Sequence, residues 1–220
     1  MKNSLSRWVN SDINIDSKYL QSTDPQLLNK AQSYKHAVMH EWERPIMELD
    51  AKFITQKGGR ILNIGHGMGI IDSYIKASNP EHHTIVEIHP QIVERAKTQG
   101  YKDVWEGDWV DFIKECNLKN VKYDGIYFDT YCFERFEWKL FTQIVTTILN
   151  PGGIYSYFNG GAAKFQKIKE YLIELGWSYN EEQIEVTSIL LEFGKEIPTP
   201  QIHTCIWWEK PINHINEKLL

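Results

Sequence analysis

Five strand-like segments alternate with helix-like segments between residues 60 and 177, and this alternation limits the folds open to the chain. The strand-like segments are apolar runs at residues 60–65, 83–89, 102–108, 123–130 and 152–159. Apolar residues at helical spacing follow them, at residues 68–78, 90–100, 109–119, in a segment that ends near residue 149, and at 163–177. Repeated β-α units favour a mostly parallel sheet with helices on both faces. We therefore expect an α/β, Rossmann-like domain.

The pattern changes after residue 177. Residues 183–193 and 203–210 are strand-like, and no helical segment separates them. The connecting stretch GKEIPTPQ (194–201) holds two prolines and is expected to be a loop. Two consecutive strands favour an antiparallel pair added to the parallel sheet, which gives seven strands. We expect one domain over 1–220, with a lid of loop and helix at 1–59 and the core at 60–220.

Composition narrows the class of partner and the compartment. The net charge of the 220 residues is −5, and no basic cluster is present, so nucleic acid is not an expected partner. No apolar run approaches the roughly 20 residues of a membrane helix, and the polar N-terminus shows no secretory signal. The three cysteines are scattered, without metal-like spacing, which favours a reducing compartment. We expect a cytoplasmic monomer or homodimer without a metal.

Three glycines stand where the first strand meets its helix. Gly65, Gly67 and Gly69 allow a tight turn and a close approach of the backbone to a ligand. Their spacing is G-x-G-x-G, so the third position of the dinucleotide motif G-x-G-x-x-G falls on Ile70. The turn is therefore typical of a nucleotide site, while a site for NAD is disfavoured.

Two further strand ends favour an adenosine-bearing ligand. Glu87 ends the second strand, 22 residues after Gly65, where a carboxylate accepts hydrogen bonds from ribose hydroxyls. Asp108 and Trp109 stand at the end of the third strand, where one can bind an adenine amino group and the other can cover a ring face. The final antiparallel pair favours S-adenosyl-L-methionine (SAM), because it is typical of SAM-dependent methyltransferases. This last step is an analogy of fold.

Two acidic residues are candidates for the chemistry. Asp129 ends the fourth strand, and the carboxyl ends of parallel strands face the ligand crevice. Glu43 shares with Met39 and Met47 the i, i+4, i+8 spacing of one helix face. The alternative interpretation of that stripe is two core methionines and a glutamate at the rim.

The segments VMHEWERPIM, GGRILNIGHGMGI, VEIHP, GDWVDF, YDGIYFDTY and LNPGG…YFN, in this order, resemble the guanidinoacetate N-methyltransferase family from Val38 to Asn159. The resemblance implies that Glu43 and Asp129 hold the guanidinium of the substrate and that Trp8 corresponds to a lid tryptophan. It implies a SAM site formed by Met39, Met47, Gly65, His66, Gly67, Met68, Gly69, Ile70, Ile71, Glu87, Ile88, His89, Asp108, Trp109 and Asp129.

One turn departs from the family pattern. The family holds the substrate carboxylate with a polar, hydroxyl-bearing turn, whereas this chain has NGGAAKF (159–165). Backbone N–H groups there can still bind an anion, or the smaller residues can admit a bulkier guanidine. We therefore expect Trp8, Glu43, Asp129, Asn159, Gly161 and Ala162 to contact the substrate.

The expected activity is methyl transfer from SAM to a guanidino nitrogen of a small molecule. Arginine, a cyclic natural-product guanidine and guanidinoacetate itself stay open as substrates. A protein arginine is a weaker interpretation, because the sequence shows no double-glutamate hairpin and no barrel domain. The alternatives are a methyltransferase of a non-guanidine amine and a SAM-binding module without turnover.

Overall fold

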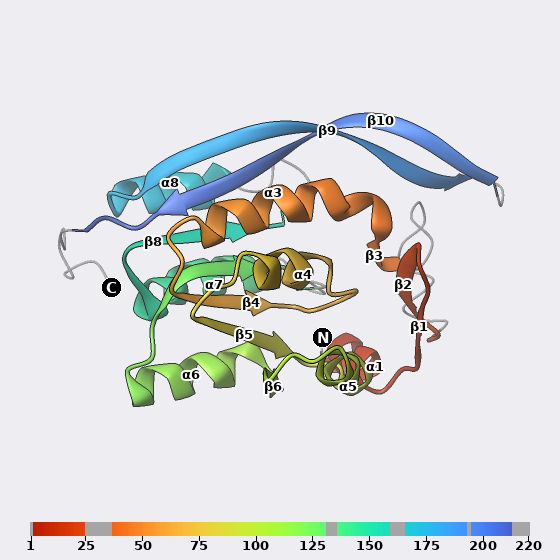
Figure 1. Ribbon diagram of the computed structural model, residues 1–220, viewed down its shortest axis with the longest axis horizontal. Coiled ribbons are helices and arrows are strands. Elements are labelled where there is room, and N and C mark those ends of the chain that lie inside the picture. Colours follow the sequence, from red (N-terminus) through yellow and green to blue (C-terminus); the bar gives the residue numbers. More distant parts are fainter. Residues whose placement is uncertain (1, 25–36, 131–135, 159–165, 193–194, 213–220) are drawn as a thin grey trace.

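A seven-stranded sheet of order β6-β5-β4-β7-β8-β10-β9 forms the centre of the protein (Figure 1). The computed structural model describes residues 2–24, 37–130, 136–158, 166–192 and 195–212. The parallel strands are β4 (Arg60–Ile64), β5 (His82–Glu87), β6 (Asp103–Glu106), β7 (Tyr123–Phe128) and β8 (Leu149–Tyr157). β9 (Ser178–Glu192) and β10 (Lys195–Glu209) add the antiparallel pair. The expected fold class is confirmed.

Helices cover both faces of this sheet because its strands are apolar on both sides. In β4, Leu62 and Ile64 join one buried cluster and Ile61 joins the other, as the two-residue period of a strand requires. Helices α6 (Trp109–Lys119), α7 (Phe136–Ile148) and α8 (Gln166–Glu174) supply the first cluster. Helices α1 (Lys2–Val9), α3 (Arg44–Thr55), α4 (Ile70–Ala77) and α5 (Pro90–Thr98) contribute to the second.

The N-terminal segment differs from the expected mixture of loop and helix. Three short strands, β1 (Ile13–Ile15), β2 (Tyr19–Ser22) and β3 (Ala37–His40), form a separate antiparallel sheet. A 3-10 turn, η1 (Glu41–Glu43), then leads into α3. The expected helical stripe of Met39, Glu43 and Met47 is therefore wrong, because these residues lie in β3, η1 and α3 in turn. Packing still brings Met39 and Met47 into one buried cluster with Trp8.

The expected loop at residues 194–201 is also wrong, because β10 begins at Lys195. β10 pairs with β9 along its whole length but with β8 only at Trp207–Glu209. Pro198 and Pro200 can stand in a strand here, since no β8 partner requires their missing N–H groups. The rest of the pair runs past the carboxyl end of β8, over α3 and toward β3 (Figure 1).

Two properties of the described residues bear on function. None of their helices combines the length and the apolar character needed to cross a bilayer. Within the same residues, no group of three or more His, Cys, Asp or Glu side chains is arranged so that it could hold a metal ion.

Candidate functional site

The glycine turn joins the end of β4 to the end of β7. The Gly65 N–H donates to the Val86 carbonyl (2.9 Å), and the Asp129 N–H donates to the Ile64 carbonyl (2.9 Å). A Cβ atom on Gly65 would lie 1.8 Å from the carbonyl oxygen of Asp129. A Cβ atom on Gly67, which has a φ of +53°, would lie 2.8 Å from the sulfur of Met39. Glycine is thus required for the turn to approach Asp129 and Met39 this closely.

Glu87, at the end of β5, faces a pocket that the glycine turn also lines, and its carboxylate has a fixed orientation. Its Oε2 accepts a hydrogen bond from the His66 N–H (2.9 Å), and its Oε1 accepts from the N–H groups of Ile88 (2.9 Å) and His89 (2.8 Å). A carboxylate can accept about four hydrogen bonds, so capacity remains for a donor in the pocket.

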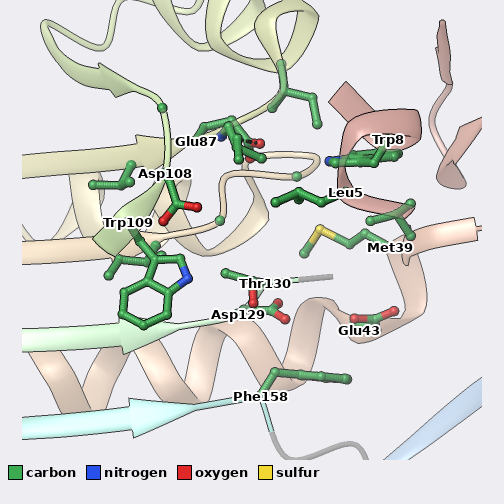
Figure 2. Close-up of a pocket in the computed structure, with 18 residues that line it drawn as sticks. Leu5, Trp8, Met39, Glu43, Glu87, Asp108, Trp109, Asp129, Thr130 and Phe158 are labelled. Atoms are coloured by element: carbon green, nitrogen blue, oxygen red, sulfur yellow. Dashed lines mark hydrogen bonds between the residues drawn. The ribbon is translucent and has the colours of Figure 1, made fainter. Parts of the chain in front are cut away.

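Asp108 and Trp109 border the pocket at the start of α6 (Figure 2). The Oδ1 of Asp108 accepts a hydrogen bond from the Val110 N–H (2.7 Å) and caps the helix. The Trp109 ring is nearly buried and meets Phe128 and Phe141 edge to face, with centroid distances of 5.6 and 5.2 Å. This packing fixes the indole as one wall of the pocket.

Two carboxyl groups face the pocket, that of the buried Glu43 from η1 and that of the half-buried Asp129 from the end of β7 (Figure 2). The Oε1 of Glu43 accepts a hydrogen bond from the His40 N–H (3.0 Å). Burial, and then the charge of Asp129, raises the pKa of Glu43 to about 8. Burial, and then the charge of Glu87, raises the pKa of Asp129 to about 7.

In the part of the chain that the structure describes, no lysine or arginine forms an ion pair with Glu43 or Asp129. Both raised pKa values have the same physical origin: negative charge is removed from water without a cation to balance it. Such a pocket is suited to a positively charged ligand with several N–H donors.

Asp50 is also buried but does not line the pocket, and the sequence did not identify it as a candidate residue. It accepts a hydrogen bond from the Tyr127 hydroxyl (3.1 Å), and its Oδ1 lies 3.0 Å from the Ser156 Oγ. Burial raises the pKa of Asp50 to about 8, and the charge of Asp129 adds to the effect. Its place in α3, facing β7 and β8, carries no signature in the sequence, because the apolar pattern of the helix continues around it.

The expected residues divide into three groups. Those that line the pocket are Trp8, Met39, Glu43, Gly65, Gly67, Glu87, Ile88, Asp108, Trp109 and Asp129. Those that the structure describes but that do not line the pocket are Met47, His66, Met68, Gly69, Ile70, Ile71 and His89. Those outside the described residues are Asn159, Gly161 and Ala162.

His66 shows why a loop residue need not reach the ligand. Its side chain is fully buried and turned toward α4, with Nδ1 2.7 Å from the Asp72 Oδ2 and Nε2 3.2 Å from the Gln99 Oε1. His89 instead packs its ring 4.8 Å from that of Trp8, and its Nε2 lies 3.1 Å from the Ser11 carbonyl oxygen. The contribution of His66 and His89 to the pocket is through the backbone N–H groups that hold Glu87.

Several lining residues were missed. They are Leu5, Val38, Ile64, Val86, Ile92, Gly107, Thr130 and Phe158. Leu5 stands one helical turn before Trp8, and Thr130 and Phe158 follow the ends of β7 and β8. The rule that parallel strands present ligand residues at their carboxyl ends would have found the last two.

Known proteins share the sequence pattern and the fold of this chain. A family model described as guanidinoacetate N-methyltransferase matches residues 14–201, beyond both ends of the expected match. The protein arginine N-methyltransferase 2 of Emericella nidulans is 33% identical over 199 residues, which are 84% of this chain and 44% of the relative. The chain thus spans less than half the length of this curated relative.

Solved structures support the fold. The precorrin-6y C5,15-methyltransferase of Geobacter metallireducens GS-15 aligns with a TM-score of 0.56 at 13% identity, over 78% of this chain and 90% of that one. The O-methyltransferase TomG of Streptomyces achromogenes, solved with SAM, aligns with a TM-score of 0.53 at 13% identity, over 76% and 80%. At such identities the likeness concerns the fold alone. With the family model covering most of its length, the chain belongs to the guanidinoacetate N-methyltransferase family, whose cofactor is SAM.

Proposed function

We propose that the protein transfers a methyl group from SAM to a nitrogen of a guanidinium group on a small molecule. The observation that carries this proposal is the acid pair. Glu43 is buried and Asp129 is half-buried, and both line one pocket and have raised pKa values, which a bound cation would reverse. This favours a cationic acceptor with several N–H groups over a neutral oxygen or carbon acceptor.

SAM would occupy the part of the pocket that Glu87, Asp108 and Trp109 line. Glu87 would hold the ribose hydroxyls, Asp108 and Trp109 would hold the adenine, and the glycine turn with Met39 would bound the methionine portion. The sulfur of Met39 lies so close to Gly67 that a Cβ atom there would be 2.8 Å from it, so Met39 and the glycine turn form one wall, which supports this placement. When bound, SAM supplies an electrophilic methyl group on a positively charged sulfur.

The residues of the chain would prepare the acceptor. A guanidinium has a pKa of about 12.5–13.8, so it arrives protonated, and its nitrogen lone pairs are delocalised. Glu43 and Asp129 would accept hydrogen bonds from the N–H groups on two edges of the guanidinium and would concentrate electron density on the reacting nitrogen. They would also fix its direction of approach, which lowers the barrier through orientation. Asp129 would accept the proton that the nitrogen releases.

A protein arginine is the second candidate substrate, because the curated relative from Emericella nidulans carries that activity in its name. The acid pair would serve an arginine side chain as well as a free guanidine. The three N–H donors of an alkylammonium radiate from one nitrogen and lack the planar, paired arrangement that matches two carboxylates, and a SAM-binding module would leave both carboxylates without a partner.

A substrate panel tests these alternatives. The protein would be incubated with SAM and guanidinoacetate, arginine, a cyclic guanidine, an arginine-containing peptide or simple alkylamines, and S-adenosylhomocysteine would be followed by mass spectrometry. Turnover with a small guanidine supports the proposal, and turnover with the peptide alone moves the substrate to protein arginine. Turnover only with alkylamines, or with nothing, refutes the proposal.

A further inference from the structure

Glu43 and Asp129 would contact the edges of a guanidinium, but neither residue would contact its two flat faces. The edges carry all the N–H donors, while the faces are flat, weakly hydrated and carry delocalised charge. A site that selects this group over a compact ammonium needs a flat surface against a face. The following inference rests on the proposed function and concerns the residue that provides that surface.

Phe158 stands beside Asp129 at the carboxyl edge of the sheet. The parallel register of β7 and β8 pairs Phe128 with Tyr157, and the Phe158 N–H donates to the Phe128 carbonyl (3.2 Å). One step further along the register, Asp129 and Phe158 are neighbours. Adjacent strands are about 4.8 Å apart, so these two side chains project next to one another.

Both side chains also belong to the same face of the sheet. Tyr127, two residues before Asp129, and Ser156, two residues before Phe158, both contact Asp50 of α3. Side chains two residues apart in a strand share a face, so Asp129 and Phe158 lie on the α3 side, as Glu43 does. Phe158 lines the pocket with both acids, and Figure 2 places its ring beside them, away from Glu87 and Asp108.

The Phe158 ring is supported from behind by the antiparallel pair. The ring of His203 in β10 lies 5.5 Å from it, centroid to centroid, at an interplanar angle of 21°. Burial lowers the pKa of His203, so at neutral pH its ring adds no charge that would oppose a cation nearby. The backing ring restrains Phe158, so a ligand would meet a preformed surface.

We propose that the ring of Phe158 packs against the face of the substrate guanidinium and selects planar, delocalised cations over compact ammonium ions. A cation within about 6 Å of an aromatic centroid is attracted by the ring, and this attraction grows when water is excluded. A guanidinium adds dispersion contacts over its whole plane, which a tetrahedral ammonium cannot match. Phe158 then selects for a planar cation, and the carboxylates of Glu43 and Asp129 select for a positive charge.

The test compares two monocations on one variant. The probes are methylguanidine and methylammonium, titrated calorimetrically into the protein loaded with S-adenosylhomocysteine. Phe158→Leu removes the aromatic face at nearly constant volume. It should weaken methylguanidine binding roughly 3- to 30-fold, while the affinities for methylammonium and S-adenosylhomocysteine change less than about two-fold. Phe158→Tyr keeps the ring and should restore methylguanidine binding to within about three-fold of the parent.

Phe112→Leu is the matched control. Phe112 is a buried ring of α6 that packs in the core cluster formed with α7 and α8, and it does not line the pocket. It should lower the melting temperature without changing the selectivity. If Phe158→Leu is too unstable to titrate, Phe158→Met serves in its place. An equal loss for both cations, or a failure of Phe158→Tyr to restore binding, overturns the inference. Absence of methylguanidine binding to the parent protein refutes the proposed function as well, whereas unchanged binding in Phe158→Leu refutes the inference alone.

Discussion

The negative charge of Asp129 raises the pKa of Glu43, although the two residues come from segments 86 positions apart in the sequence. The coupling arises because η1 and the end of β7 present their carboxyl groups to one water-poor pocket. Each carboxylate makes the other harder to ionise until a cation enters. This relationship gives the site a measurable proton balance.

Binding of a guanidinium should release protons near neutral pH. At pH 6.5 the carboxyl of Glu43, with a pKa of about 8, and much of that of Asp129, at about 7, are protonated in the free protein. A bound cation favours their ionised forms. Calorimetric titration of methylguanidine in buffers of different ionisation enthalpy should therefore show release of one to two protons at pH 6.5 and almost none at pH 9. Identical heats in all buffers at pH 6.5 would contradict this prediction.

The stability of the free protein should fall as the pH rises from about 4 to about 8. Glu43, Asp50 and Asp129 have raised pKa values in the folded state, so the folded protein holds protons in this window that the unfolded chain has released. Stability decreases with pH wherever the folded state binds more protons. Urea midpoints measured at pH 5, 6.5 and 8 should decline in that order, and Asp129→Asn should reduce the slope. A midpoint that rises over this range would show that these groups ionise freely in the folded protein.

Asp129→Asn and Glu43→Gln should separate two roles. The Asp129→Asn variant loses the proton acceptor and should lower kcat by about 10²- to 10⁴-fold. The Glu43→Gln variant loses one charge-assisted contact and should raise KM for the guanidine by about 10- to 100-fold. SAM affinity, measured by calorimetry, should stay within a few-fold of the parent in both. A large loss of SAM affinity in Asp129→Asn would instead assign this residue to the cofactor.

Glu87→Gln should weaken SAM binding by about 10- to 100-fold, because one carboxylate oxygen that accepts backbone N–H groups becomes an amide. Glu106→Gln is the matched control, since Glu106 pairs with Glu87 in the register of β5 and β6 but is exposed and lies outside the pocket. Equal SAM affinities for the two variants would show that Glu87 does not hold the cofactor.

The sequence predicted the sheet because its strands and helices are long enough to display their periods. The β1 strand, Ile13–Ile15, has three residues, too few for an alternation to be visible, and the sheet that it joins was missed. The prolines of β10 led to the wrong prediction of a loop for a different reason. Proline has no N–H group to donate to a neighbouring strand, and whether a neighbouring strand lies on that side depends on the tertiary fold.

The sequence predicted those site residues that are both ionisable and located at the end of a predicted strand. Glu87 and Asp129 are acids at strand ends, and both line the pocket. Phe158 is also at a strand end, so the rule for the ends of parallel strands includes it, but an aromatic residue carries no charged or polar group that would mark it as a ligand contact. His66 stands in the glycine turn, yet its side chain is directed to Asp72, a preference set by α4 packing that no local pattern reveals.

The contact between the Gly65 turn and the Asp129 carbonyl, too close for a Cβ atom, has an evolutionary consequence. The segment that we propose seats the cofactor and the segment that we propose receives the proton share one backbone junction, so a mutation that shifts one would displace the other. Divergence toward new substrates would then be expected to spare this junction and to accumulate at the rim, where Phe158 stands. Enzyme engineers who wish to change the acceptor without losing the donor have the same choice of positions.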